Sequence, residues 1–166
     1  MAQIAFKGNP VNTSGELPKV GTQAPNFHLV KTDLSSVSLS DYKGKKVILN
    51  VFPSLDTSVC AAGVRKFNVE AAKTTDTVIL AISKDLPFAH ARFCSTEGID
   101  NVIPASAFRD TDFEQSYGVM MLDGPLAGLL ARAVIVIDEN GKIIYEELVP
   151  EITTEPNYAA AIEHAK

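Results

Sequence analysis

Residues 47–60 read Val-Ile-Leu-Asn-Val-Phe-Pro-Ser-Leu-Asp-Thr-Ser-Val-Cys, and this stretch predicts a buried strand that leads into a helix. Its first part, Val47 to Phe52, is apolar apart from Asn50, so we expect a central strand covered on both faces. Apolar residues then return at helical spacing, at Val64, Phe67 and Ala71. Cys60 therefore lies where a buried strand passes into a helix.

This position suits an activated thiol. The first turn of a helix offers unpaired backbone N–H groups and the positive end of the helix dipole, and both favour a thiolate. The thiolate, and not the thiol, is the nucleophilic form of cysteine. Cys60 is therefore the candidate nucleophile of this chain.

Length and charge limit the classes of protein to consider. The chain has 166 residues, 46% of them hydrophobic, and a net charge of −5. The length predicts a single domain over residues 1–166. The negative charge argues against nucleic acid and anionic membranes as partners, because both need a basic patch. Without a secretory signal or a long apolar run, we expect a cytoplasmic protein, in which cysteines are more often catalytic or redox-sensing than permanently bridged.

Strand and helix patterns alternate along the chain. A hairpin is expected within about residues 1–15, and strands at 27–30, 37–39, 77–83, 102–103, 133–137 and 143–148. Helices are expected from Cys60 to about Lys73, then at 87–97, 112–117 and 158–166, with a helical turn at 40–42. This order predicts an α/β fold, with a central mixed sheet and helices on both faces.

Three residues could act beside Cys60. Arg132 comes directly before a buried strand, where a lone cation needs a partner, which could be the thiolate or a salt bridge at the sheet edge. Thr57 could direct its hydroxyl at the thiolate or at a substrate oxygen, although its spacing favours a helix cap. Pro53 could simply end the strand, or it could shield the thiolate from solvent.

Cys94 is the second cysteine and lies in the helix expected at 87–97. It could be an inert buried thiol, which is common. It could also be a resolving thiol, which condenses with a sulfenic acid to form a disulfide. A disulfide needs Cα atoms within about 7 Å, so the segment around Cys94 would have to unwind if both cysteines lie in helices.

The sequence patterns that mark zinc sites, dithiol oxidoreductases and phosphate-binding loops do not occur in this chain. The histidines at 28, 90 and 164 have no ligand spacing to a cysteine, which argues against zinc. A thioredoxin-type oxidoreductase would need a C-x-x-C pair, and no phosphate-binding glycine motif occurs. A Cys–His hydrolase is not excluded but has no supporting pattern.

The motif Pro53-x-x-x-Thr57-x-x-Cys60 resembles the active-site signature of the peroxiredoxins. The run from Asn50 to Ala62 resembles the thiol peroxidase subfamily in particular. The resemblance covers essentially the whole chain, including Phe6–Val11, Phe93–Cys94, Phe108–Asp110 and Leu129–Ala133.

The resemblance implies a thioredoxin-like fold with an extra N-terminal hairpin, and an enzyme without a metal or prosthetic group. It implies that Cys60 is the peroxidatic cysteine, that Thr57 and Arg132 complete its site and that Pro53 screens it. Cys94 becomes the resolving cysteine of an intrasubunit disulfide, as in atypical 2-Cys peroxiredoxins. Thioredoxin is the implied reductant, a homodimer the implied assembly, and alkyl hydroperoxides the preferred substrates over hydrogen peroxide.

Three hypotheses about function follow. The favoured one is a thioredoxin-dependent peroxidase that reduces hydrogen peroxide and organic hydroperoxides. The alternatives are a peroxide sensor that passes its oxidised state to a partner protein, and a binding domain in which both cysteines belong to the core. The apolar segments Met120–Leu122 and Leu126–Leu130 could line a groove for a bulky hydroperoxide, join a dimer contact, or pack against the domain.

Overall fold

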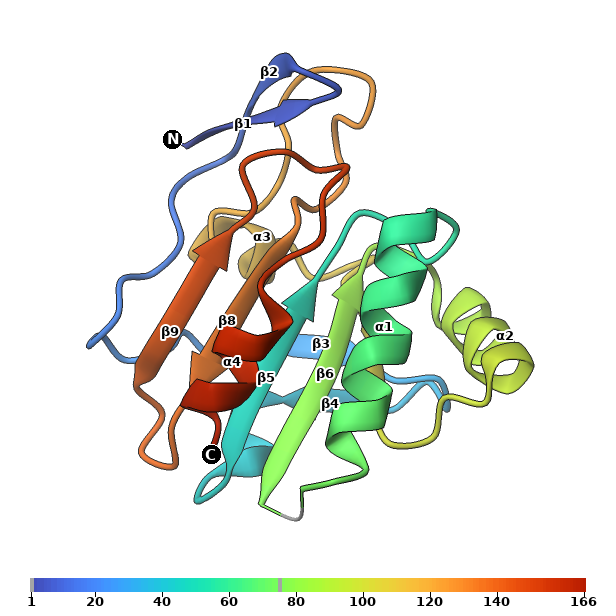
Figure 1. Ribbon diagram of the computed structural model, residues 1–166, viewed down its shortest axis with the longest axis vertical. Coiled ribbons are helices and arrows are strands. Elements are labelled where there is room, and N and C mark those ends of the chain that lie inside the picture. Colours follow the sequence, from blue (N-terminus) through green and yellow to red (C-terminus); the bar gives the residue numbers. More distant parts are fainter. Residues whose placement is uncertain (1, 75) are drawn as a thin grey trace.

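A computed structural model describes residues 2–74 and 76–166 of the chain (Figure 1). The strand β5 (Lys46–Val51) lies inside a seven-stranded sheet, between β6 (Thr77–Ser83) and β8 (Ala133–Ile137). It pairs in parallel with β6 and antiparallel with β8, so the sheet is mixed. The order of the strands across the sheet is β4-β3-β7-β6-β5-β8-β9.

The remaining elements follow the expected order. The other strands of the main sheet are β3 (His28–Val30), β4 (Ser36–Ser38), β7 (Ile103–Ser106) and β9 (Ile143–Leu148), and a separate hairpin consists of β1 (Gln3–Phe6) and β2 (Asn9–Asn12). The helices are α1 (Ser58–Ala71), α2 (Pro87–Glu97), α3 (Thr111–Ser116) and α4 (Tyr158–His164), with a 3₁₀ turn η1 (Leu39–Tyr42). The mixed sheet flanked by helices and the extra N-terminal hairpin are thus confirmed.

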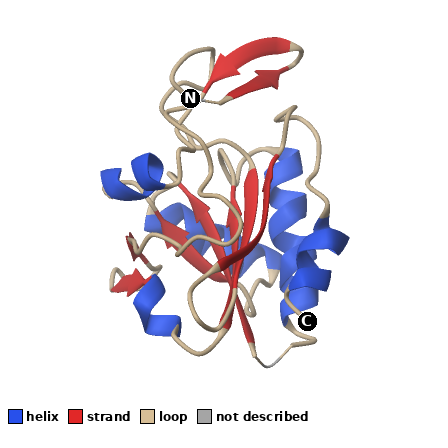
Figure 2. Cartoon of the chain, turned by 90° about the vertical axis from the view of Figure 1, so that its left-hand side faces the viewer, coloured by secondary structure: helices blue, strands red, loops and turns tan. Residues whose placement is uncertain are grey.

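Helices cover both faces of the main sheet, which Figure 2 shows nearly edge-on. Side chains of β5 alternate between the two faces, because successive residues of a strand point in opposite directions. Leu49 packs with Phe113 and Tyr117 on the side of α3, whereas Ile48 packs with Phe67 on the side of α1. This double burial explains why residues 47–52 carry almost no polar side chain.

The N-terminal hairpin lies beyond one end of the main sheet, at the top of Figure 1. It encloses a third, small apolar cluster, formed by Ile4, Val11, Met121, Ala131 and Ile152. The helix α1 begins at this same end, because it follows the carboxyl end of β5. The hairpin, the start of α1 and the start of β8 therefore share one end of the molecule.

In the part of the chain that the structure describes, no helix is both long and apolar enough to cross a membrane.

Two glycines with left-handed backbone test how closely the turn after α3 packs against residues 15 and 16. Gly118 and Gly98 have φ angles of 65° and 67°, but an added Cβ at Gly118 would lie 2.5 Å from the amide nitrogen of Glu16, whereas open space surrounds Gly98. We expect Gly98→Ala to lower the free energy of unfolding by about 1 kcal/mol, and Gly118→Ala by about 3 kcal/mol. Urea unfolding measures both. Equal losses would contradict the close contact between Gly118 and Glu16.

Candidate active site

Cys60 is the third residue of α1 and is only 1% exposed. Thr57 is the N-cap of this helix, and its carbonyl accepts the first helical hydrogen bond, from the amide of Ala61 at 3.0 Å. The amides of Ser58, Val59 and Cys60 precede that bond, so they have no acceptor within the helix. The thiol therefore lies among free N–H groups at the positive end of a 14-residue helix.

Thr57 occupies the cap position that its spacing predicts, but its hydroxyl makes no capping bond. The hydroxyl donates instead to the carbonyl of Ser54 at 3.1 Å, and the Thr57 amide donates to the same carbonyl at 3.2 Å. A hydroxyl that donates in this way still has acceptor lone pairs. Pro53 lies at the start of this loop and is buried, whereas Thr57 is exposed at its surface.

Arg132 lies at the same end of the sheet as Cys60. In the register of β5 and β8, Val51 pairs with Ala133, so Arg132 stands opposite the residue after β5, where the loop toward Cys60 begins. The side chain of Arg132 is 3% exposed, and its Nε donates to the carbonyl of Ile152 at 2.9 Å. Among the described residues no carboxylate forms an ion pair with it, so the alternative of a sheet-edge salt bridge is wrong.

Tyr158 of α4 lies close enough to Arg132 and Cys60 for the charges of both to affect its pKa. The pKa of Tyr158 is raised to about 12, mainly by burial and also by Glu155 and Cys60, against the opposing effect of the Arg132 cation. A Cβ on Gly63, three residues beyond Cys60 in α1, would lie 3.0 Å from the Tyr158 hydroxyl. Tyr158 was not predictable as a site residue, because an aromatic residue in a terminal helix is typical of ordinary core packing.

Asp85 holds the loop that leads to Cys60. Its carboxylate accepts from the amide of Leu55 at 2.8 Å and from the hydroxyls of Ser54 at 2.9 Å and Ser83 at 2.7 Å. Ser54 in turn binds Thr57, so Asp85 links the start of α1 to the loop between β6 and α2. One sequence signal could have identified Asp85: it lies just after the carboxyl end of the buried strand β6, beside the end of β5.

Cys94 lies in α2 and is half-buried. It packs against the same hydrophobic cluster that contains Cys60, and both thiols are free. Burial raises the pKa of the Cys94 thiol to about 11, so this thiol is protonated at neutral pH in the folded helix. The structure thus places both cysteines around one apolar cluster, without a disulfide between them.

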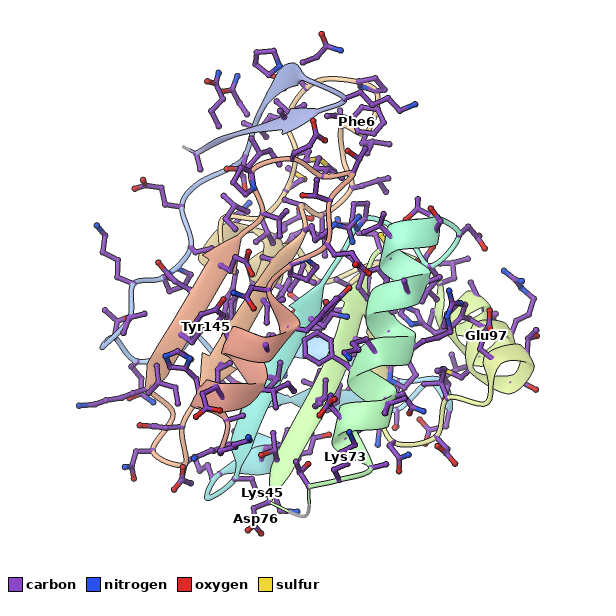
Figure 3. All side chains as sticks on the ribbon, viewed as in Figure 1. Phe6, Lys45, Lys73, Asp76, Glu97 and Tyr145 are labelled. Carbon is purple, nitrogen blue, oxygen red and sulfur yellow. The ribbon has the colours of Figure 1, made fainter. Side chains whose placement is uncertain are left out.

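A groove of about 420 Å³ runs between α1 and α2 beside the Cys60 turn. Thr57 and Ala61 line it from α1, and Phe93 lines it from α2. The ion pair between Arg65 and Glu97, 3.1 Å long, connects the two helices, and Glu97 is labelled in Figure 3. A larger cavity of about 520 Å³ lies near Lys45, at the opposite end of the sheet, and contains neither cysteine.

The apolar segments at 120–122 and 126–130 pack mainly under the N-terminal hairpin. Met121 and Leu130 are fully buried, and Met121 belongs to the small cluster beneath β1 and β2. Leu122 is 43% exposed, Ala127 and Gly128 are also exposed, and Leu126 and Leu129 are half-buried. At Met121 and Leu130 this burial favours ordinary packing over a groove for a bulky hydroperoxide.

Comparison with known proteins fits this geometry. The Redoxin family model matches residues 19–162. A thiol peroxidase of Corynebacterium glutamicum is 57% identical over 162 residues, which cover 98% of this chain and 98% of that protein. A thiol peroxidase of Mycobacterium tuberculosis is also 57% identical over 162 residues, covering 98% of this chain and 97% of its own.

Solved structures share the fold over nearly the full chain. A peroxiredoxin-like protein from Aquifex aeolicus superposes with a TM-score of 0.94 at 41% identity, over 99% of this chain and 96% of that one. A thiol peroxidase from Chromobacterium violaceum has a TM-score of 0.88 at 21% identity, over 98% and 95% of the two chains, and supports the fold alone. The chain therefore belongs to the Redoxin family, in its thiol peroxidase group.

Proposed function

We propose that Cys60 is the residue through which this thiol-dependent peroxidase reduces hydrogen peroxide and organic hydroperoxides. The observation that carries the proposal is the position of a buried thiol at a helix N-terminus, at the same end of the sheet as a buried, carboxylate-free Arg132. Both features favour the thiolate, which is the attacking species. The thiol peroxidases that match nearly the full chain support the same activity.

The first step transfers one oxygen atom to sulfur. The Cys60 thiolate attacks an oxygen of the hydroperoxide; an S–O bond forms, the O–O bond breaks, and the leaving alkoxide or hydroxide takes a proton to give an alcohol or water. Negative charge grows on the leaving oxygen, so fixed donors aimed at it lower the barrier. The free N–H groups of the first turn and the Arg132 guanidinium supply such donors. The Thr57 hydroxyl gives its proton to the Ser54 carbonyl and offers its lone pairs to the hydroperoxide O–H, and the buried Pro53 screens the site.

The second step closes a disulfide. Cys94 attacks the sulfenic sulfur of Cys60; an S–S bond forms, the S–O bond breaks, and the hydroxide that leaves takes a proton to give water. The buried Cys94 thiol has a raised pKa in folded α2, so its attack requires this helix to unwind and release the thiol. Unwinding both restores an ordinary thiol acidity and lets the two sulfur atoms meet.

A dithiol must then reduce the disulfide, and we propose thioredoxin in the cytoplasm, where such reductants keep thiols reduced. We also propose a homodimer. Leu86, Phe88 and Phe108 are 50%, 66% and 39% exposed, and hydrogen bonds of residues 106 and 107 to residues 83 and 85 bring these loops together. Exposed apolar groups of this size are typical of protein interfaces.

A peroxide sensor would use the same residues but differ in turnover. A sensor passes its oxidised state to a client protein, so thioredoxin would recycle it slowly. The free half-buried Cys94 favours the enzyme, because a second thiol in the same chain can reset Cys60 without a client. A trapped mixed disulfide with another protein would instead favour the sensor.

Two cysteine variants test the proposed function. Consumption of NADPH with thioredoxin, its reductase and cumene hydroperoxide should vanish in Cys60→Ser. The variant Cys94→Ser should also lose continuous turnover, but it should still consume about one equivalent of peroxide, because Cys60 can form its sulfenic acid without a resolving thiol. Undiminished turnover in Cys60→Ser would overturn the assignment of the nucleophile, and full turnover in Cys94→Ser would show that another thiol resolves it.

The buried state of Cys94 has its own test, in the Cys60→Ser background. Because burial raises the pKa of Cys94 to about 11 from an ordinary 9.0, alkylation by iodoacetamide in the folded protein should be slow and should rise with pH up to about 11. The same protein in urea should react quickly, with its midpoint near the ordinary value. A folded protein that reacted as fast as the unfolded one would contradict the need for helix unwinding.

A further inference from the structure

The backbone segment at residues 149–152 orients the guanidinium of Arg132. Its Nε donates to the Ile152 carbonyl at 2.9 Å, and its own carbonyl accepts from the Val149 amide at 3.0 Å. No described residue accepts from the other two guanidinium nitrogens, so these are available for a thiolate or a peroxide oxygen. The guanidinium is planar and rigid, so the position of the Ile152 carbonyl sets the direction of those two nitrogens.

The N-terminal hairpin holds this segment in turn. The amide of Ala5 in β1 donates to the Pro150 carbonyl at 2.7 Å, and the amide of Ile152 donates to the Ala5 carbonyl at 2.9 Å. The Ile152 side chain is buried at 3% exposure in the small cluster that also contains Ile4 and Val11. Ile152 is therefore fixed to the hairpin through both its backbone and its side chain.

Glu151 forms a second contact between this segment and the hairpin, at the turn between β1 and β2. Its carboxylate accepts from the amides of Gly8 at 2.8 Å, Lys7 at 3.2 Å and Thr153 at 3.0 Å, and from the Thr153 hydroxyl at 2.9 Å. Lys7 and Gly8 have φ angles of 51° and 82°, a left-handed turn whose two amides meet the carboxylate. The Thr153 and Gly8 bonds hold the pKa of Glu151 at about 2, so it is ionised throughout the neutral range.

We propose that the N-terminal hairpin positions the active-site arginine, and that Glu151 is the positioning residue that couples the two. The hairpin and Glu151 together hold the Ile152 carbonyl where it directs Arg132. The family match begins at residue 19, so the hairpin is an addition to the common Redoxin fold that lies at the Cys60 end of the sheet. Figure 3 labels Phe6 on this hairpin. The inference rests on the proposed role of Arg132.

Asp123 offers a matched control on the same hairpin. Its carboxylate accepts from the amide of Asn12 at 2.9 Å and from the Asn12 side-chain amide at 3.0 Å. It thus holds β2 as Glu151 holds the turn, but it has no hydrogen bond to the segment at 150–153 among the described residues. Loosening the hairpin at Asp123 should therefore leave the Ile152 carbonyl in place.

The experiment measures the second-order rate of Cys60 oxidation by cumene hydroperoxide in a single turnover, followed as loss of the thiol. Glu151→Gln keeps the shape of the side chain but turns an amide NH₂ toward backbone N–H donors. We expect this variant to react about tenfold more slowly than the wild type, and Asp123→Asn to stay within about twofold. Thr153→Val removes one of the four bonds to Glu151 and should give an intermediate loss, which keeps the test open if Glu151→Gln folds poorly.

A double variant separates positioning from general damage to the fold. Arg132→Lys removes Nε, so Glu151→Gln should cause no further loss of rate in that background. This inference would be overturned if Glu151→Gln and Thr153→Val reacted at the wild-type rate while Arg132→Lys reacted slowly. That outcome would leave the proposed function intact. An equal loss from Glu151→Gln in both backgrounds would also overturn it. A wild-type rate in Arg132→Lys would instead refute the role of Arg132 in the proposed function.

Discussion

The Cys60 end of this structure is organised around the permanent positive charge of Arg132, which is buried at the end of the sheet. Arg132 is 3% exposed and has no carboxylate partner among the described residues, and leaving a buried cation unpaired costs several kcal/mol. The Ile152 carbonyl satisfies only Nε. A thiolate at Cys60 would supply the missing negative charge, so in this account the same burial that fixes the arginine also favours the reactive form of the cysteine.

Segments that are distant in the sequence meet at this end of the molecule. The carboxyl end of β5 leads into α1 with Cys60, β8 begins beside Arg132, α4 brings Tyr158, and the hairpin lies above them in Figure 1. The two cysteines have different surroundings. Cys60 is held in the first turn of a long helix, whereas burial in α2 raises the pKa of the Cys94 thiol to about 11. In the proposed mechanism, these two environments separate the attack on peroxide from the closing of the disulfide.

The elements were predictable where local chemistry marks them. Pro87 and Gly98 bound α2 at its predicted ends, since proline suits a first helical turn and glycine a left-handed C-cap. The strand β7 is longer than predicted, because Pro104 reads as a break although it lies within the strand. Glu151 was not predictable, because it binds Gly8 across 143 residues of sequence, and a carboxylate that accepts from backbone amides leaves no local pattern. Tyr158 was not predicted because an aromatic residue in a terminal helix is typical of core packing. Cys60 and Thr57 were predicted from their motif, and Arg132 from its place before a buried strand and from the family resemblance.

The most direct test of the account is the mass of the reduced protein after one equivalent of hydroperoxide, with its peptides mapped under non-reducing conditions. If Cys94 resolves Cys60 within one chain, the protein should lose two hydrogen atoms and yield one linked peptide that joins Cys60 to Cys94. Cys60 that accumulates as sulfenic or sulfinic acid beside a free Cys94, or a bridge between two chains, would contradict the account.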